Sequence, residues 1–299
     1  MEYRSIFLAN PAQLSVRNQQ LVIRQGQEVS IPMEDISGLL IESQQVTITS
    51  AAMQNLTEYG VTVYFCDEKH LPAALVLPMN RHSRQLKQIQ SQIALSLPAK
   101  KRMWQSIVQQ KIRNQALCLE FLECPRAVEL RSIADDVRSG DPDNYEAIAA
   151  ARYFPALFGT GFSRGEECVT NAALNYGYAI LRGAIARNLV MHGLDPCLGI
   201  FHHSELNQFN LADDLIEPFR PLVDLFVATH IDPEETELRP AIKQNLFDLT
   251  NFLVSQNQKQ YRSITAIGRS VESIVRVMQK REKELELPTL IPLKKYRYE

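Results

Sequence analysis

The sequence lacks any long apolar run. None of its hydrophobic stretches approaches the roughly 18–20 residues that a membrane-spanning helix needs, and the mean hydropathy is -0.18. The first four residues, Met1 to Arg4, hold neither the basic segment nor the apolar core of a secretory signal. The sequence therefore predicts a protein without a membrane partner.

Cysteine is also scarce. The chain of 299 residues holds five cysteines, an odd number, and no two of them form a CxxC pair. This pattern argues against a disulfide framework and against a zinc knuckle. Unpaired thiols are typical of a reducing compartment, so we expect a cytoplasmic protein. The GxxxxGK[ST] loop is absent as well, so no nucleotide site of the P-loop type is expected.

Acidic residues are missing from one long segment. Between Lys69 and Leu119 there is no Asp or Glu, although nine Lys and Arg occur there. From Glu205 to Glu237 the balance reverses, with nine acids and a single base, Arg220. A basic surface beside an acidic, histidine-containing patch is typical of an enzyme that holds a polyanion around a metal ion. Two oppositely charged solvated faces would give the same pattern, so charge alone leaves both interpretations open.

The spacing of apolar residues divides the chain into two halves of different character. Up to residue 78, short alternating and β-branched runs predict a small meandering sheet with one short helix over 50–59, capped by Ser50. After residue 78 the apolar residues recur at helical spacing. The longest helices are expected over 166–192, 211–229, 237–253 and 265–284.

The fold class that follows is α+β. We expect a small β-rich domain over residues 1–78, a linker over 79–84, a larger all-helical domain over 85–285 and a C-terminal tail over 286–299. The tail holds two prolines and several basic and aromatic residues, which favours an extended arm. A frayed end would have the same composition.

Three side chains of the helical half could hold a metal ion. Glu146 stands one turn into an expected helix, His202 emerges from an apolar segment, and Glu217 directly precedes a proline that disturbs its helix. Asp214 shares a helix face with Glu217, because the two are three residues apart. Carboxylates with one imidazole suit Mg²⁺ or Mn²⁺. A helix-stabilising surface acid and a core histidine would explain the same residues without a metal.

A polar stripe runs along the long helix expected over 166–192. Asn171, Asn175, Tyr178 and Arg182 fall at i, i+4, i+7 and i+11, so they share one face of an otherwise apolar helix. Amides, a phenol and a guanidinium can bind phosphates and sugars without sequence selectivity. A hydrogen-bonded seam between helices is an equally good interpretation of the stripe.

Three segments of the helical half carry a resemblance to a known family. They are Glu146-x-x-x-x-Ala151-Arg152-Tyr153-Phe154, Asn171-Ala172-Ala173-Leu174-Asn175-Tyr176-Gly177-Tyr178, and Leu198-Gly199-Ile200-Phe201-His202 followed by Asp213-Asp214-Leu215-Ile216-Glu217-Pro218-Phe219-Arg220-Pro221. In this order and spacing they resemble the CRISPR-associated integrase of the adaptation machinery. The run from Asn207 to Asp214 is similar to the form found in type II systems.

The resemblance implies a metal-dependent DNA endonuclease and integrase that inserts spacer DNA into a CRISPR array. It implies that Glu146, His202 and Glu217 are catalytic and hold Mg²⁺ or Mn²⁺, with Asp214 as a nearby acid of secondary weight. His203 is the second choice for the imidazole ligand. The 3′-hydroxyl of the captured DNA would attack a phosphodiester at the repeat and displace another DNA 3′-hydroxyl.

The same resemblance implies partners. They are double-stranded DNA (the spacer fragment and the CRISPR repeat), a second copy that dimerises through the β-rich domain, and a small ferredoxin-like companion protein. The candidate DNA-binding residues are Arg84, Lys87, Arg152, Asn171, Asn175, Tyr178, Arg182 and Arg220. Two alternatives remain open at this point: a non-catalytic nucleic-acid-binding scaffold, and a stand-alone structure-selective metal-dependent nuclease that uses water as its nucleophile.

Overall fold

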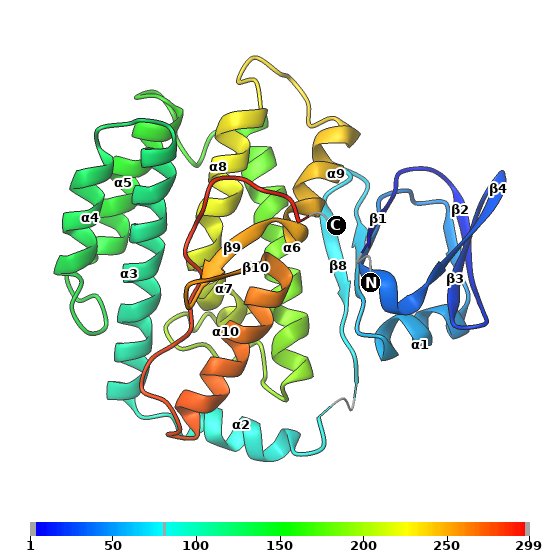
Figure 1. Cartoon of the computed structure of the whole chain (residues 1–299), viewed down its shortest axis with the longest axis horizontal. Coiled ribbons are helices and arrows are strands. Elements are labelled where there is room, and N and C mark those ends of the chain that lie inside the picture. The colour runs from blue at the N-terminus through cyan, green and yellow to red at the C-terminus, as the bar shows by residue number, and fades with distance from the viewer. Residues whose placement is uncertain (1–3, 80–81, 297–299) are drawn as a thin grey trace.

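The strand-rich half of the chain forms two sheets of four strands each. In the computed structural model, which describes residues 4–79 and 82–296, one sheet has the order β1-β5-β7-β8 and the other β4-β3-β2-β6 (Figure 1). The strands are β1 (Arg4–Leu8), β2 (Ala12–Arg17), β3 (Gln20–Gln25), β4 (Gln27–Pro32), β5 (Ile36–Ile41), β6 (Val46–Ile48), β7 (Thr62–Cys66) and β8 (Pro72–Val76).

The predicted meander is present only over β2, β3 and β4, which are successive antiparallel neighbours. β1, β5 and β7 run parallel to one another, and β6 runs parallel to β2. Parallel neighbours need crossover connections, and α1 (Ser50–Glu58) lies in the connection from β6 to β7. The expected cap, Ser50, is instead the first helical residue. The hydroxyl of Thr49 accepts a hydrogen bond from the Ala52 N–H at 3.3 Å and caps the helix.

The first sheet belongs to both halves of the molecule. Successive side chains of a strand point to opposite faces. Leu39 and Val63 therefore lie in the core of the strand-rich half, whereas Leu40 and Tyr64 lie in the core of the helical half. The Tyr64 hydroxyl also donates a hydrogen bond to the Ile180 carbonyl at 2.7 Å. Figure 1 shows the second sheet on the side away from the helices.

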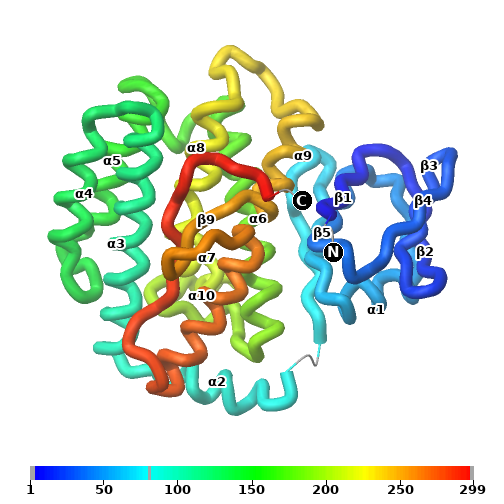
Figure 2. The backbone as a smooth tube through the Cα atoms, viewed as in Figure 1, coloured from blue at the N-terminus to red at the C-terminus, as the bar shows by residue number. Residues whose placement is uncertain are grey.

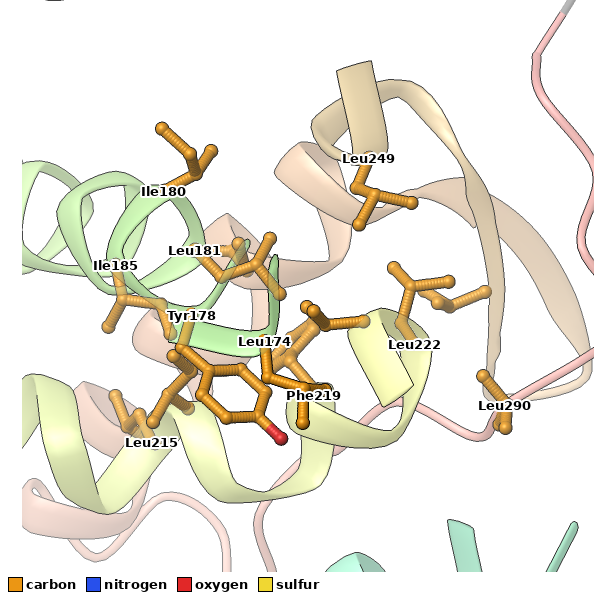
Figure 3. Close-up of a cluster of buried hydrophobic side chains, with 14 of the residues drawn as sticks. Leu174, Tyr178, Ile180, Leu181, Ile185, Leu215, Phe219, Leu222, Leu249 and Leu290 are labelled. Atoms are coloured by element: carbon orange, nitrogen blue, oxygen red, sulfur yellow. The ribbon is translucent and has the colours of Figure 1, made fainter. Parts of the chain in front are cut away.

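Most residues of α6, a long helix of the helical half, are buried by the helices around it. The helices of this half are α2 (Gln85–Ile93), α3 (Leu97–Phe121), α4 (Ala127–Asp136), α5 (Tyr145–Phe158), α6 (Val169–Met191), α7 (Asn210–Ile216), α8 (Arg220–His230), α9 (Pro240–Asp248) and α10 (Ser263–Met278). Figure 3 shows Leu174, Tyr178 and Leu181 of α6 packed against apolar side chains of later segments. None of the helices in the described part of the chain combines the length and the apolarity needed to cross a bilayer. The α+β class and its order, strands first and helices after, are confirmed.

Two details of the helical half correct the prediction. The helix expected over 211–229 is divided into α7, a 3-10 turn over Glu217–Phe219, and α8. The half is also not all-helical, because β9 (Leu253–Gln256) and β10 (Lys259–Arg262) form a hairpin where the helix over 237–253 was expected to end. Asn257 and Gln258 make its turn with φ of 51° and 63°. Asn-Gly is the usual signal of such a turn, and Asn-Gln is not.

The C-terminal tail is extended and fastened to the helical half. Its backbone bridges β9 at Ser255↔Thr289, and Leu290 is buried. The side-chain amide of Asn114 in α3 donates to the Pro288 carbonyl at 2.9 Å and accepts from the Leu290 N–H at 3.0 Å. Figure 2 shows this segment, in red, running beside α10 and β9 and then across α8. A frayed end is therefore the wrong description of residues 286–296. Residues 297–299 of the tail and 80–81 of the linker lie outside the described residues.

Candidate metal centre

Glu146 owes its position to the start of α5. The Asp141 carboxylate accepts hydrogen bonds from the backbone N–H groups of Tyr145 at 2.8 Å and Glu146 at 3.0 Å, and so satisfies two donors at the helix start. The carboxylate of Glu146 is 24% exposed and points toward α3. The residue at the N-cap position is Asn144, so Asp141 supports the helix start from three residues further upstream.

Glu217 lies in the turn that interrupts the chain between α7 and α8. Pro218 follows it and cannot donate a backbone hydrogen bond, which favours a break in the helix at this point. The Asn114 amide donates to the Pro218 carbonyl at 2.7 Å and holds the turn against α3. The Glu217 side chain is 5% exposed, so its carboxylate is fixed in the interior.

The two carboxylates meet at one ammonium group. The Lys111 Nζ of α3 lies 2.6 Å from Glu146 Oε1 and also forms an ion pair with Glu217 Oε2. Burial lowers the pKa of Lys111, but Glu217 and Glu146 outweigh this effect and raise it. The sequence analysis missed Lys111, which it counted only as one of the nine cations of the acid-free segment. Its place on the apolar face defined by Ile107, Val108 and Ile112 was an available signal.

Arg220 gives Glu217 a second positive partner. Its Nε donates to Glu217 Oε1 at 2.9 Å, and its guanidinium lies over the Tyr178 ring, 4.5 Å from the centroid. Burial by itself would raise the pKa of Glu217, but Arg220 and Lys111 lower it to about 2. Glu217 is therefore ionised at neutral pH.

His202 is oriented by Asp214. The Asp214 carboxylate is fully buried and accepts hydrogen bonds from the backbone N–H groups of Ile200 at 2.5 Å, Phe201 at 3.1 Å and His202 at 3.0 Å. It also lies 2.8 Å from His202 Nδ1. This hydrogen bond raises the pKa of His202 against the effect of burial, and Glu217 and Glu146 add to the rise. Asp214 thus leaves only Nε2 of the imidazole for a further partner.

The two neighbouring histidines have different surroundings. His203 is exposed, and its Nδ1 lies 2.8 Å from the carbonyl of Phe201 in its own loop. The loop can bring His202 back to Asp214 because position 199 is glycine. A Cβ at Gly199 would lie 2.0 Å from the His202 carbonyl oxygen. The Gly199-x-x-His202 spacing therefore has a steric cause.

The donor set fits a hard divalent cation. Within residues 4–79 and 82–296, no three His, Cys, Asp or Glu side chains form a ready-made ligand cluster. Glu146 and Glu217 nevertheless direct one oxygen each at a single positive charge. Glu217 Oε2 is buried and accepts no hydrogen bond of ordinary geometry from the described residues, although it lies beside the Lys111 ammonium. Two carboxylate oxygens of this kind are the ligands that Mg²⁺ and Mn²⁺ prefer.

A second buried carboxylate lies behind the first. Asp224 of α8 accepts a hydrogen bond from the Tyr153 hydroxyl at 3.0 Å and another from the Tyr178 hydroxyl. Burial raises the pKa of Asp224 to about 6, although both hydroxyl groups act to lower it. Asp224 was not predicted as a site residue, and the sequence placed Tyr153 only in a family motif and Tyr178 in the polar stripe.

The candidate DNA-binding residues differ in exposure and in whether they contact other side chains of the chain. Arg84 and Lys87 are exposed at the start of α2. The other candidates are engaged within the chain: Arg152 with Glu129, Asn171 and Asn175 with Arg164, Tyr178 with Asp224, Arg182 with Asp213 and Arg220 with Glu217. In the acid-free segment, Arg113 likewise pairs with Asp135. The stripe on α6 thus has the contacts of a seam between segments, and DNA binding at these positions stays a prediction.

Comparison with known proteins gives consistent relatives. The family model described as "CRISPR associated protein Cas1" matches residues 6–245. The "CRISPR-associated endonuclease Cas1" of Neisseria meningitidis serogroup C (strain 8013) is 45% identical over 305 residues, and the match covers 100% of each chain. A solved casposase bound to its integration product superposes with a TM-score of 0.77 at 22% identity, covering 95% of this chain and 92% of that one. A Cas6-RT-Cas1–Cas2 complex gives a TM-score of 0.69 at 17% identity, covering 94% of this chain and 35% of that one.

Proposed function

Because this chain belongs to the CRISPR-associated Cas1 family and has the integrase-type function of spacer acquisition, we propose that Glu146, His202 and Glu217 hold the divalent ion at which DNA strands are joined. The ion is Mg²⁺ or Mn²⁺ on this proposal. His202 is the imidazole ligand, and Asp214 orients it.

The observation that carries the proposal is the convergence of two carboxylates. Glu146 and Glu217 are 71 positions apart in the chain, yet both contact one positive charge. Two carboxylates that meet in a largely buried place repel one another and lose their hydration, which is unfavourable unless a cation lies between them. In a non-catalytic scaffold the same ion pairs with Lys111 and Arg220 would only stabilise the fold, and strand joining separates the two cases.

The chemistry follows from the positions of the groups. The divalent ion, when bound, polarises the phosphodiester and lowers the pKa of the attacking 3′-hydroxyl. Glu217 is kept ionised by Arg220, so that it can act as a ligand without first losing a proton. Asp214 fixes the ring of His202 and spares it from reorganising during the reaction. In the joining step, the attacking 3′-oxygen forms a bond to phosphorus while the bond from phosphorus to the leaving 3′-oxygen breaks.

The wider assembly is part of the same proposal. We propose that the chain binds duplex DNA with exposed cations such as Arg84 and Lys87, and that it acts as a homodimer through its strand-rich half. It would work with a small companion protein, as Cas1 does with Cas2 in the complex of similar fold named above. Location in the reducing cytoplasm rests on the cysteine content, and all five thiols are free.

The proposal is tested by strand joining. The full-length protein, its companion, Mn²⁺, a short duplex and a supercoiled repeat-containing plasmid should yield joined product with the wild-type chain. Glu217→Gln and His202→Ala should each lower the joining rate more than about 100-fold, because each removes a group that acts on the transition state. Duplex binding should stay near wild type, since phosphate contacts elsewhere supply most of the affinity.

Glu205→Gln is the matched control, because it makes the same chemical change at an exposed acid of the same region. It should leave joining unchanged. Wild-type joining rates in Glu217→Gln, or a loss of folding in step with the loss of joining, would contradict the proposed ligand set. Release of plasmid nicks without joined product would indicate water as the nucleophile.

A further inference from the structure

We propose that Lys111 competes with the divalent ion for Glu146 and Glu217, and that this competition makes metal binding depend on DNA. The inference rests on the proposed function, because it takes the two glutamates as ligands. It concerns a residue to which the motifs of the sequence assign no role.

The geometry places the ammonium at the point where a cation would be held. Lys111 Nζ is 2.6 Å from Glu146 Oε1 and forms an ion pair with Glu217 Oε2. An ion bound to the same two oxygens would be at about 2.0–2.3 Å from each. The ammonium and the ion cannot share this space, and their charges repel one another. Binding of the ion therefore requires Lys111 to move.

The balance of charge gives the same result. Lys111 and Arg220 already neutralise the two negative charges of Glu146 and Glu217. A divalent ion added to this group would leave two uncompensated positive charges in a largely buried place, which is strongly unfavourable. If the ammonium leaves, the ion replaces one positive charge and the excess falls to one. A phosphate can neutralise that remaining charge.

The exposed fractions show where the ammonium can go. The side chains of Lys111 and Glu217 are 10% and 5% exposed, whereas those of Glu146 and His202 are 24% and 38% exposed. Glu146 and His202 are thus the more exposed members of this group, and we infer that a phosphodiester approaches from their side. A lysine has a flexible stem of four carbons. We infer that the ammonium moves from Glu217 toward the incoming phosphate, so that DNA favours binding of the ion and the ion favours binding of DNA.

The experiment measures Mn²⁺ affinity rather than activity. Free Mn²⁺ is followed by electron paramagnetic resonance as it is titrated into the full-length protein, with and without a short duplex. Wild type should bind Mn²⁺ weakly alone and about tenfold or more tightly with DNA. Lys111→Met should bind Mn²⁺ about tenfold more tightly than wild type without DNA, and DNA should then add little. Lys111→Arg keeps the positive charge and should bind no more tightly than wild type.

Lys243→Met is the matched control. Lys243 is likewise a buried lysine that pairs with a buried glutamate, because its Nζ lies 2.7 Å from Glu42 Oε1 and its side chain is 9% exposed. The pair joins α9 to the strand-rich half, and Figure 1 shows α9 on the opposite side of the helical half from α3 and α5. Loss of this lysine should not change Mn²⁺ affinity, which separates a specific competition from a general effect of losing a buried charge.

Thermal unfolding supplies the second measurement. Lys111→Met leaves the buried Glu217 and the partly exposed Glu146 with one cation, so its unfolding midpoint should fall in EDTA and rise with Mn²⁺ more than that of wild type or Lys243→Met. A variant that unfolds and that Mn²⁺ does not restore would overturn the inference. So would equal Mn²⁺ affinities of wild type and Lys111→Met.

A separate result would sink the proposed function itself. If wild type with DNA binds no Mn²⁺, or if Glu217→Gln binds Mn²⁺ as wild type does, Glu217 is not a ligand. If wild type binds Mn²⁺ through Glu217 and only the effect of Lys111 is missing, the proposed function stands and the competition is wrong.

Discussion

Glu217 and Asp224 are both buried and lie seven residues apart, yet the protein compensates them in opposite ways. Glu217 faces two cations, Lys111 and Arg220, and its pKa falls to about 2. Asp224 faces hydroxyl groups, those of Tyr153 and Tyr178, and burial raises its pKa to about 6. The first carboxylate stays charged through the whole neutral range. The second carboxylate, with a pKa of about 6, takes up a proton when the pH falls slightly below neutral.

The difference separates two uses of a buried acid. A carboxylate paired with cations stays charged in the interior, which on our proposal lets Glu217 exchange the Lys111 ammonium for a metal ion. A carboxylate bound by fixed hydroxyl groups instead joins segments of the fold, here α5, α6 and α8. Arg220 connects the two sites, because it pairs with Glu217 and stacks on Tyr178. Burial alone would not have told the two acids apart; their partners do.

The largest loss of stability is expected when a cation that pairs with Glu217 is removed. Arg220→Met leaves Glu217 with Lys111 alone and should lower the free energy of unfolding by about 3–5 kcal/mol, as the loss of a partner in a buried ion pair does. Urea denaturation at pH 7 measures the change. Arg131→Met removes an exposed ion pair with Glu120 and should lose less than about 1 kcal/mol. Equal losses in the two variants would show that Glu217 does not depend on Arg220.

The hydroxyl side of the comparison predicts a pH dependence. The folded state raises the pKa of Asp224 from 3.8 to about 6, so it binds the proton more tightly than the unfolded state does. Stability from this group is therefore greatest below pH 3.8 and falls as the pH rises to about 6. The loss amounts to about 3 kcal/mol, from the shift of about two pH units.

Asp224→Asn should remove this loss. The difference in unfolding free energy between the variant and wild type should change by up to about 3 kcal/mol in favour of the variant between pH 4 and pH 7. Urea denaturation across that range measures it. Glu217 contributes with the opposite sign, because its pKa is lowered, and its share is lost only as the pH falls from 4.5 toward 2. Parallel pH curves for wild type and variant would show that Asp224 keeps its ordinary pKa.

The smallest change in stability is expected when a single hydroxyl oxygen is removed from a tyrosine beside Asp224. Tyr178→Phe removes one of the two hydroxyl groups that hold Asp224 and should lower stability by about 1–3 kcal/mol at pH 7, since a buried acceptor loses a donor. Tyr176→Phe is the matched control two residues earlier in α6. Its hydroxyl is buried and finds no hydrogen-bond partner among the described residues, so the change should be neutral or slightly stabilising. Chemical denaturation of both variants under one condition decides the matter; equal losses would count against the Asp224 network.

The sequence contained the class of fold and the break at Glu217, because both have local causes. Alternating and helical spacing separates the two halves of the chain, and Pro218 has no backbone N–H with which to continue the helix past Glu217. The parallel strand pairs and the hairpin over 253–262 could not be predicted in this way. Pairing of β1 with β5 joins residues about thirty positions apart and leaves no local signal. The turn of the hairpin places Asn257 and Gln258 in the left-handed region, and Gln is not a residue that predicts this conformation.

The candidate site could be predicted only as a set of ligand types. Glu146, His202 and Glu217 can be named from motifs, and their role as ligands stays a prediction. That Lys111 lies between two of them depends on how α3 packs against α5 and the 3-10 turn. The same limit applies to Asp224, whose partners come from α5 and α6. Periodicity states which face of a helix is buried but not which charged groups meet there.

The fastening of the tail has a consequence for the order in which the protein is made. Asn114 binds both the Pro218 carbonyl, next to Glu217, and the backbone around Leu290. A growing chain on the ribosome gains its contacts from the N-terminus onward. The turn that carries Glu217 therefore receives its last support only after residue 290 has emerged. A chain that stops short of residue 288 would therefore lack the contacts that tie the tail to Asn114, beside the turn that carries Glu217.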